Sequence, residues 1–119
     1  MAFGDVVLGP TTKSAASATS VTDTFGSAVT AGNLIVVCHF TGATDSQAYT
    51  GMTEAVALTD GPNADQGAIY YRVVQGGDGT TWGADSGGSD EHGMVMWEIE
   101  GPFAASPLDQ TAQNGSNPI

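Results

Sequence analysis

The sequence predicts an all-β fold, an antiparallel β-sandwich of the jelly-roll or immunoglobulin-like kind. Good helix formers are scarce: the 119 residues include 17 glycines but only two basic residues. Apolar residues occur in short runs, and turn signals rich in Gly, Pro, Asn and Asp recur roughly every ten residues. Short strands between such regular turns are typical of a sandwich or a barrel.

Three segments in the first half of the chain predict strands. Residues 5–9 form a short apolar run that ends at the turn signal Gly9-Pro10. Residues 18–25 alternate between polar and apolar side chains, as a half-buried strand does. Residues 33–41 (NLIVVCHFT) are apolar at successive positions. This last pattern predicts a central strand that is covered on both sides, at least near its start.

Four segments in the second half also predict strands. Residues 52–58 end sharply at a turn signal, and residues 67–75 (GAIYYRVVQ) and 93–100 (GMVMWEIE) alternate clearly. A glycine-rich connection leads into a short strand at residues 80–82. We expect the glycine- and acid-rich residues 87–93 to form a loop before the final strand.

The alternation also predicts which residues face the core. In each clear strand we assign one set of alternate positions to the interior. Cys38 belongs to such a set; as the single cysteine it forms no intrachain disulfide, and we expect a buried thiol. The predicted core comprises Val7, Leu34, Val36, Cys38, Phe40, Ile69, Tyr71, Val73, Val95, Trp97 and Ile99.

The chain length predicts a single domain over residues 1–119, with extended terminal segments at residues 1–12 and 103–119. The C-terminal segment is polar and has no apolar periodicity. The sparse apolar side chains of these two segments cannot form a core alone, so we expect them to dock onto a partner. The expected partner-docking residues are Phe3, Val6, Phe103, Leu108 and Ile119.

The charge balance excludes several classes of partner. The chain has thirteen carboxylates and two basic residues, which gives a net charge of −11. Such a chain repels phosphate backbones and anionic lipids, so we expect no nucleic-acid or membrane partner. The acids are spread along the chain and predict a solvated surface. The first residues lack the pattern of a signal peptide, which suits a particle assembled inside the cell.

Three segments together resemble a β-sandwich domain of phage tail and virion proteins that also occurs in bacterial secreted surface proteins. They are TFGSAVTAGNLIVVCHF, AIYYRVVQGGDGTTW and MVMWEIEGPFAASPLDQTAQ, and they span residues 21–113 approximately. In that family an AGNL turn opens a core strand, and a PLD segment follows a later strand. The resemblance implies a fold and a surface setting, but it brings no active-site residues.

The resemblance also implies an open edge. Further strands usually follow the PLD segment in that family, whereas this chain stops soon after Asp109. The domain is then a short variant, a fragment, or a domain whose missing edge is supplied by another chain. A sandwich that lacks C-terminal strands exposes unpaired backbone groups, which favour pairing with another chain. We therefore expect a non-enzymatic structural component of a phage virion or extracellular surface. It would be a capsid decoration (cement) protein or a tail or fibre module that docks onto a scaffold protein or oligomerises.

The alternative function is a carbohydrate-binding or adhesin module. Aromatic rings stack on sugar faces, and this function requires Tyr49 and Trp82 to be exposed and coplanar. An enzyme is less well supported, because Glu98 and Glu100 share one strand face and point the same way. The two carboxyl groups of a glycosidase lie on opposite sides of the sugar bond.

Two acidic segments carry oxygen ligands of the type that calcium prefers. Neither has the spacing of an EF-hand, and turns favour Asp, Asn and Gly for conformational reasons alone. We therefore expect no cofactor and no metal, with these segments as the weak candidates. The candidate calcium ligands are Asp60, Asn63 and Asp65 in one segment and Asp85, Asp90 and Glu91 in the other.

Overall fold

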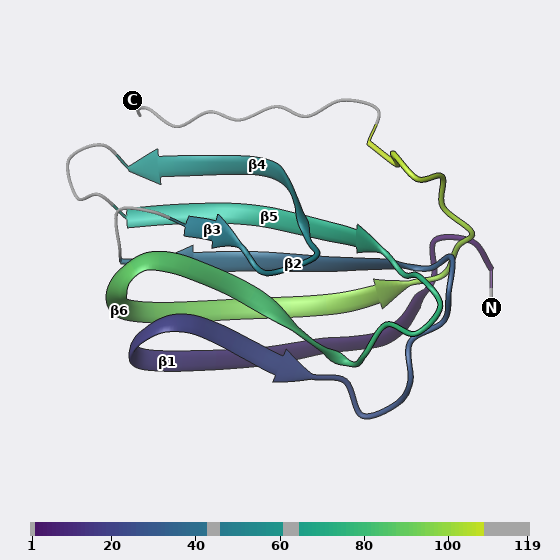
Figure 1. The fold of residues 1–119 in the computed structure, drawn as a ribbon, viewed down its shortest axis with the longest axis horizontal. Coiled ribbons are helices and arrows are strands. Elements are labelled where there is room, and N and C mark those ends of the chain that lie inside the picture. The colour runs from purple at the N-terminus through teal and green to yellow at the C-terminus, as the bar shows by residue number, and fades with distance from the viewer. Residues whose placement is uncertain (1, 43–45, 61–64, 109–119) are drawn as a thin grey trace.

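The structure, a computed structural model, describes residues 2–42, 46–60 and 65–108 and confirms the all-β class. The described residues contain strands and loops but no helix (Figure 1), and so no helix among them is long and apolar enough to cross a membrane. The strands are β1 (Val6–Thr24), β2 (Leu34–Thr41), β3 (Ser46–Ala48), β4 (Thr53–Asp60), β5 (Asp65–Val73) and β6 (Thr81–Ile99).

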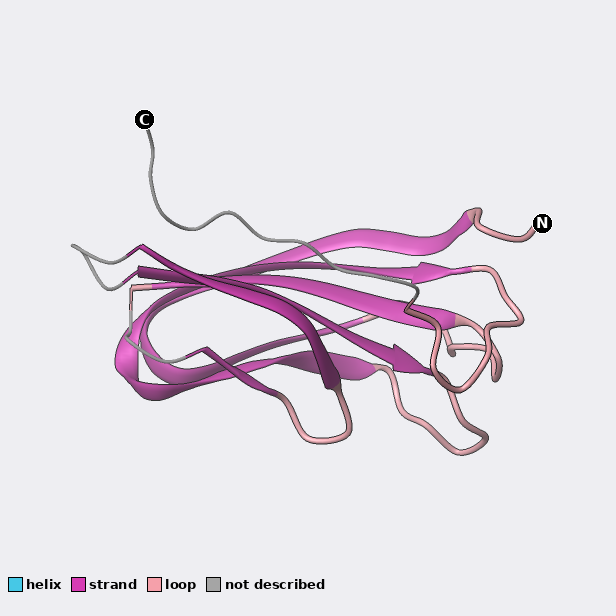
Figure 2. Ribbon diagram, turned by 90° about the horizontal axis from the view of Figure 1, so that it is seen from above, coloured by secondary structure: helices cyan, strands magenta, loops and turns pink. Residues whose placement is uncertain are grey.

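The strands form one antiparallel sheet that nearly closes into a barrel. Its order is β1-β6-β2-β5-β4, so that β2 is central, and β3 pairs with β6 off this path. Strands β1 and β6 both bend at the same end of the molecule and return (Figures 1 and 2). The second half of β1, the first half of β6 and β3 therefore lie opposite the layer of β2, β5 and β4.

Two predicted breaks do not exist in the structure. The turn signal Gly9-Pro10 lies inside β1, where the register with β6 shifts between Leu8 and Thr11. The expected loop at residues 87–93 is part of the continuous strand β6, and residues 6–12 belong to β1. Glycine in a long strand marks a bulge or a bend as often as an end. The signal at Gly9-Pro10 coincides with a register shift, and neither signal ends its strand.

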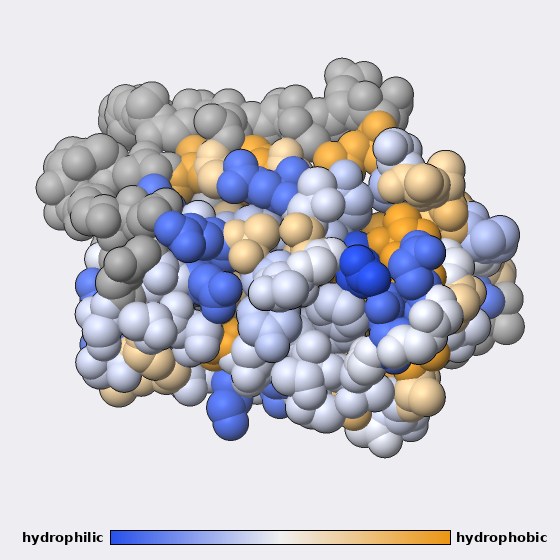
Figure 3. All heavy atoms as spheres, viewed as in Figure 1, coloured by the Kyte–Doolittle hydropathy of each residue, from blue (hydrophilic) through white to orange (hydrophobic). Residues whose placement is uncertain are grey.

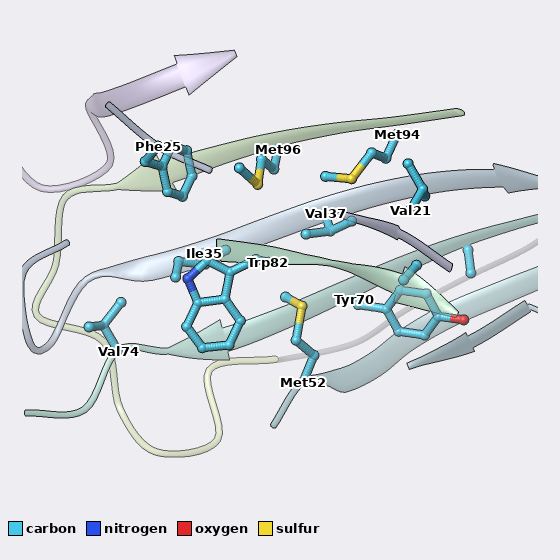
Figure 4. Close-up of a cluster of buried hydrophobic side chains, with 12 residues drawn as sticks. Val21, Phe25, Ile35, Val37, Met52, Tyr70, Val74, Trp82, Met94 and Met96 are labelled. Carbon is cyan, nitrogen blue, oxygen red and sulfur yellow. The ribbon is translucent and has the colours of Figure 1, made fainter. Parts of the chain in front are cut away.

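The core lies between the two halves of the curled sheet (Figure 4). Val21 and Phe25 of the predicted segment 18–25 are buried there, as are Ile35, Val37 and Tyr70. The remaining buried apolar residues are Met52, Ala68, Val74, Trp82, Ala84, Met94 and Met96. Strands β1 and β6 approach each other closely: a Cβ on Gly83 would collide with the backbone oxygen of Val21.

The predicted core assignment was wrong for β2, β5 and β6. The interior positions are Ile35, Val37 and His39 in β2, and the predicted set occupies the opposite face of the same strands. Both sets of alternate positions are apolar, so the period of two identifies residues that share a face without identifying the inner face. The displaced residues are Leu34, Val36, Cys38, Phe40, Ile69, Tyr71, Val73, Val95, Trp97 and Ile99, and Val7 in β1 is half-buried.

Candidate functional site

The outer side of the sheet carries a broad apolar surface, which we call the outer sheet face. It consists of the ten displaced residues of β2, β5 and β6 named above, and none of them is charged. The strand register sets them in rows of three: Leu34 lies between Val73 and Ile99, and Cys38 lies between Ile69 and Val95. A regular array of apolar side chains on a solvent-facing sheet is typical of an interaction surface.

A hollow lies at one end of this face. Phe40 is 62% exposed and is flanked by two glycines, because its neighbours in the register are Gly67 and Gly93. Because glycine has no side chain, a hollow of about 610 Å³ lies beside the Phe40 ring. Leu58 adds a second exposed apolar side chain to its lining, and Glu91 adds a carboxylate. A projecting ring and an adjacent hollow therefore lie on the same face.

A second apolar surface, the terminal patch, lies at the opposite end of the molecule. We define it by Phe3, Val6 and Phe103. The rings of Phe3 and Phe103 lie 4.9 Å apart between centroids, and Phe3 is 65% exposed. Val6 and Leu108 are exposed and Phe103 is half-buried. Four of the five expected docking residues thus lie at the surface, and Ile119 lies outside the described residues.

Backbone hydrogen bonds fix the terminal patch to the sheet. The amide of Gly4 donates to the carbonyl of Glu100 at 2.8 Å, and the amide of Glu100 donates to the carbonyl of Asp5 at 2.8 Å. Figure 3 shows one broad face of the molecule. It is mostly pale and polar, and hydrophobic residues reach the surface along β4 and at the right-hand end. The N-terminal residues and the chain just after β6 meet at that end (Figure 1).

A chain of buried polar side chains crosses the core and connects five strands. Tyr70 of β5 contacts Ser46 of β3 (Oη to Oγ, 2.7 Å), and Ser46 contacts His39 of β2 (Oγ to Nδ1, 2.7 Å). His39 Nε2 lies 2.9 Å from Nδ1 of His92 in β6, and His92 Nε2 lies 2.6 Å from the carbonyl oxygen of Ala18 in β1. All four side chains are buried.

With one proton on each imidazole, every hydrogen bond in this chain has a donor and an acceptor. The carbonyl of Ala18 only accepts, so His92 Nε2 donates and His92 Nδ1 accepts from His39 Nε2. His39 Nδ1 then accepts from the Ser46 hydroxyl, which in turn accepts from Tyr70. Burial, and secondarily the positive charge of a protonated His92, lowers the pKa of His39 to about 4.

Sequence reasoning did not find this polar chain. The sequence predicts His39 as a hydrogen-bonded strand residue, because His39 and His92 form no zinc-ligand spacing with Cys38, but it does not indicate the partners. The order Ser46, His39, His92 places a hydroxyl beside a base. However, Ser46 is 7% exposed, and its hydroxyl already donates to His39 and accepts from Tyr70. These contacts serve the packing of the two halves of the sheet.

Glu98 is also buried, and it joins two loops at the end of the molecule that carries the terminal patch. Its Oε1 accepts from the backbone amide of Thr30 and from Asn33 Nδ2, both at 2.8 Å. Asn33 Oδ1 accepts from the amide of Gly101 at 2.9 Å. Glu98 is fully buried whereas Glu100 is half-buried, so the two do not form a matched pair of carboxylates in a cleft.

The two aromatic residues of the alternative function do not form an exposed pair. Trp82 is 6% exposed, its Nε1 donates to the carbonyl of Gly79, and the guanidinium of Arg72 lies 5.5 Å from its ring centroid. Tyr49 is half-buried and packs against the core. Arg72 is itself held by a bidentate ion pair with Asp78, which lowers the pKa of that carboxyl.

The candidate calcium ligands are not brought together among the described residues. No three His, Cys, Asp or Glu side chains cluster there as a metal site would require. Asp60 and Asp65 pair in register across β4 and β5, and Asn63 lies outside the described residues. Asp85 is half-buried, and burial raises the pKa of its carboxyl. Asp90 Oδ1 accepts from the amide of Glu91, whose side chain is exposed.

Comparison with known proteins does not assign this chain to a family. No family model, no curated protein and no solved structure matches it. The resemblance to phage and surface β-sandwich domains therefore stays a prediction.

Proposed function

We propose that the chain is a non-enzymatic structural component of a phage virion or an extracellular surface. Its β-sandwich, of the jelly-roll or immunoglobulin-like kind, serves as a capsid decoration protein or as a tail or fibre module. It docks through the terminal patch onto a capsid or tail scaffold protein.

The observation that carries this proposal is the terminal patch itself. Phe3 is 65% exposed, yet its ring packs against Phe103 and its loop is hydrogen-bonded to Glu100. An exposed ring that is already held in place by a second ring loses little conformational entropy when it enters a pocket on a partner. The net charge of −11 keeps the rest of the molecule soluble and leaves the apolar patches as the sites of contact.

The test is fractionation of cells that produce the chain, with particles, envelope and soluble protein separated on a density gradient. We expect the wild-type chain to sediment with the particle or the envelope. The variant Phe3→Ser should lower the bound fraction at least about threefold, because it removes an anchor from a pocket on the partner.

The matched control is Phe40→Ser, which removes a ring of similar exposure (62%) from the opposite end of the molecule. It should leave the bound fraction unchanged. A wild-type chain that stays wholly in the soluble fraction would overturn the structural role. Equal losses for both variants would show that the terminal patch is not the docking site.

A further inference from the structure

The outer sheet face has properties that the terminal patch does not explain. Residues that the sequence assigns to a core lie there at the surface: Phe40 and Ile69 are exposed at 62% and 37%, and the other eight are half-buried. The three central strands β5, β2 and β6 each present apolar side chains on this side as well as on the inner side. A sheet that is apolar on both faces is normally covered on both faces.

We infer that the outer sheet face is the surface on which two copies of this chain pack against each other, sheet to sheet. This dimer is independent of the docking role proposed for the terminal patch.

Charge is the first argument for a second copy as the occupant. The ten side chains of the face are uncharged, although the chain as a whole carries −11. A basic partner would find no carboxylate among them. An acidic partner can pack on this face without placing its carboxylates against carboxylates of this chain. The exception is Glu91, which lines the hollow. A second copy offers the same uncharged surface.

Shape is the second argument. A twofold contact uses the same patch on both subunits, so that patch must be complementary to itself. Here Phe40 projects beside a hollow lined by Gly67, Gly93 and Leu58, so one face supplies both a protruding ring and a space for one.

Cys38 provides a direct probe of this contact. It lies in the central strand β2, between Ile69 and Val95, and it is half-buried in the single chain. It is also the single cysteine of the sequence, so any thiol reaction reports on this position. In a sheet-to-sheet dimer the two layers are about 10 Å apart, a gap that a short bismaleimide spans and a disulfide does not.

The experiment measures the mass of the purified chain by sedimentation velocity over a concentration series, together with bismaleimide cross-linking at Cys38. We expect a dimer that cross-links through Cys38. The variant Phe40→Ser should raise the dimer dissociation constant at least about tenfold and remove most of the cross-linked product. The matched variant Phe3→Ser should remain dimeric, and circular dichroism establishes that both variants are folded.

A monomer at every concentration, with Cys38 freely labelled, would overturn the inference. So would a monomer whose Cys38 becomes reactive only after removal of residues 109–119, because that segment would then be the occupant. A Cys38 thiol that is protected only on particles, from a chain that is monomeric in solution, would also overturn it. That last result would leave the proposed structural function intact.

Discussion

At the scale of single residues, the buried polar chain from Tyr70 to Ala18 shows how His39 is held neutral. Protonation of His39 would require a reversal of the Ser46 hydroxyl, which already donates to His39 Nδ1. It would also place a charge inside an apolar core beside Met94, its neighbour in the register. The depressed pKa of His39 follows from this burial first and from His92 second.

This depressed pKa predicts that acid destabilises the fold. The pKa of His39 is about 4 in the folded chain and about 6.5 in the unfolded chain. Between these values the unfolded chain binds the proton and the folded chain does not, so the free energy of unfolding falls as the pH falls from about 6.5 to about 4. Urea unfolding midpoints measured through this window should decrease accordingly.

The variant His39→Gln is the control, because it keeps a polar side chain and removes the titration. The carboxylates titrate in the same window in both proteins, so the difference between the two curves isolates His39. An imidazole signal of His39 that titrates near pH 6.5 by NMR would contradict the prediction.

At the scale of elements, β1 and β6 set the architecture because both continue through a bend. Their 19-residue lengths let each strand contribute to both halves of the curled sheet. Close approach of their backbones requires a residue without a side chain at position 83, which pairs with Thr22. The register shifts around Ala18 mark the point where β1 turns back.

We therefore predict that Gly83→Ala destabilises the protein by about 1–3 kcal/mol, as overpacking of a tight site usually does. The added Cβ would meet the carbonyl oxygen of Val21, and backbone atoms cannot move aside as a flexible side chain can. Gly26→Ala is the matched control, because a Cβ there has nothing within 4 Å. Equal urea midpoints for the two variants would refute the close approach of β1 and β6.

At the scale of the whole molecule, charge and hydrophobicity are separated on the surface. Acidic residues give the chain a net charge of −11, while the outer sheet face holds ten uncharged, mostly apolar residues. Packing two copies on this face buries apolar surface, which favours the dimer. Their remaining acidic surfaces repel each other, which opposes it. The balance between these two effects depends on salt.

We predict that the proposed dimer becomes tighter as salt increases from about 0.05 M to about 0.5 M, because salt screens the repulsion between two acidic chains and leaves the apolar contact intact. Sedimentation velocity at a fixed protein concentration measures this shift. A dimer that dissociates as salt increases would instead be held together by ion pairs, which would contradict an apolar interface.

The sequence by itself determined the β class, the positions of β2, β4 and β5, and the surface exposure of Phe3, Val6 and Leu108. These features depend on local composition and alternation, which any strand carries in its own residues. The tertiary structure decided which face of β2, β5 and β6 is buried, and it brought His39 and His92 together across 53 positions. It also showed that β1 and β6 continue through their turn signals. Alternation divides the side chains of a strand between two faces, but when both faces are apolar it does not indicate which one is buried. The elements that pack against the sheet decide which face becomes the interior.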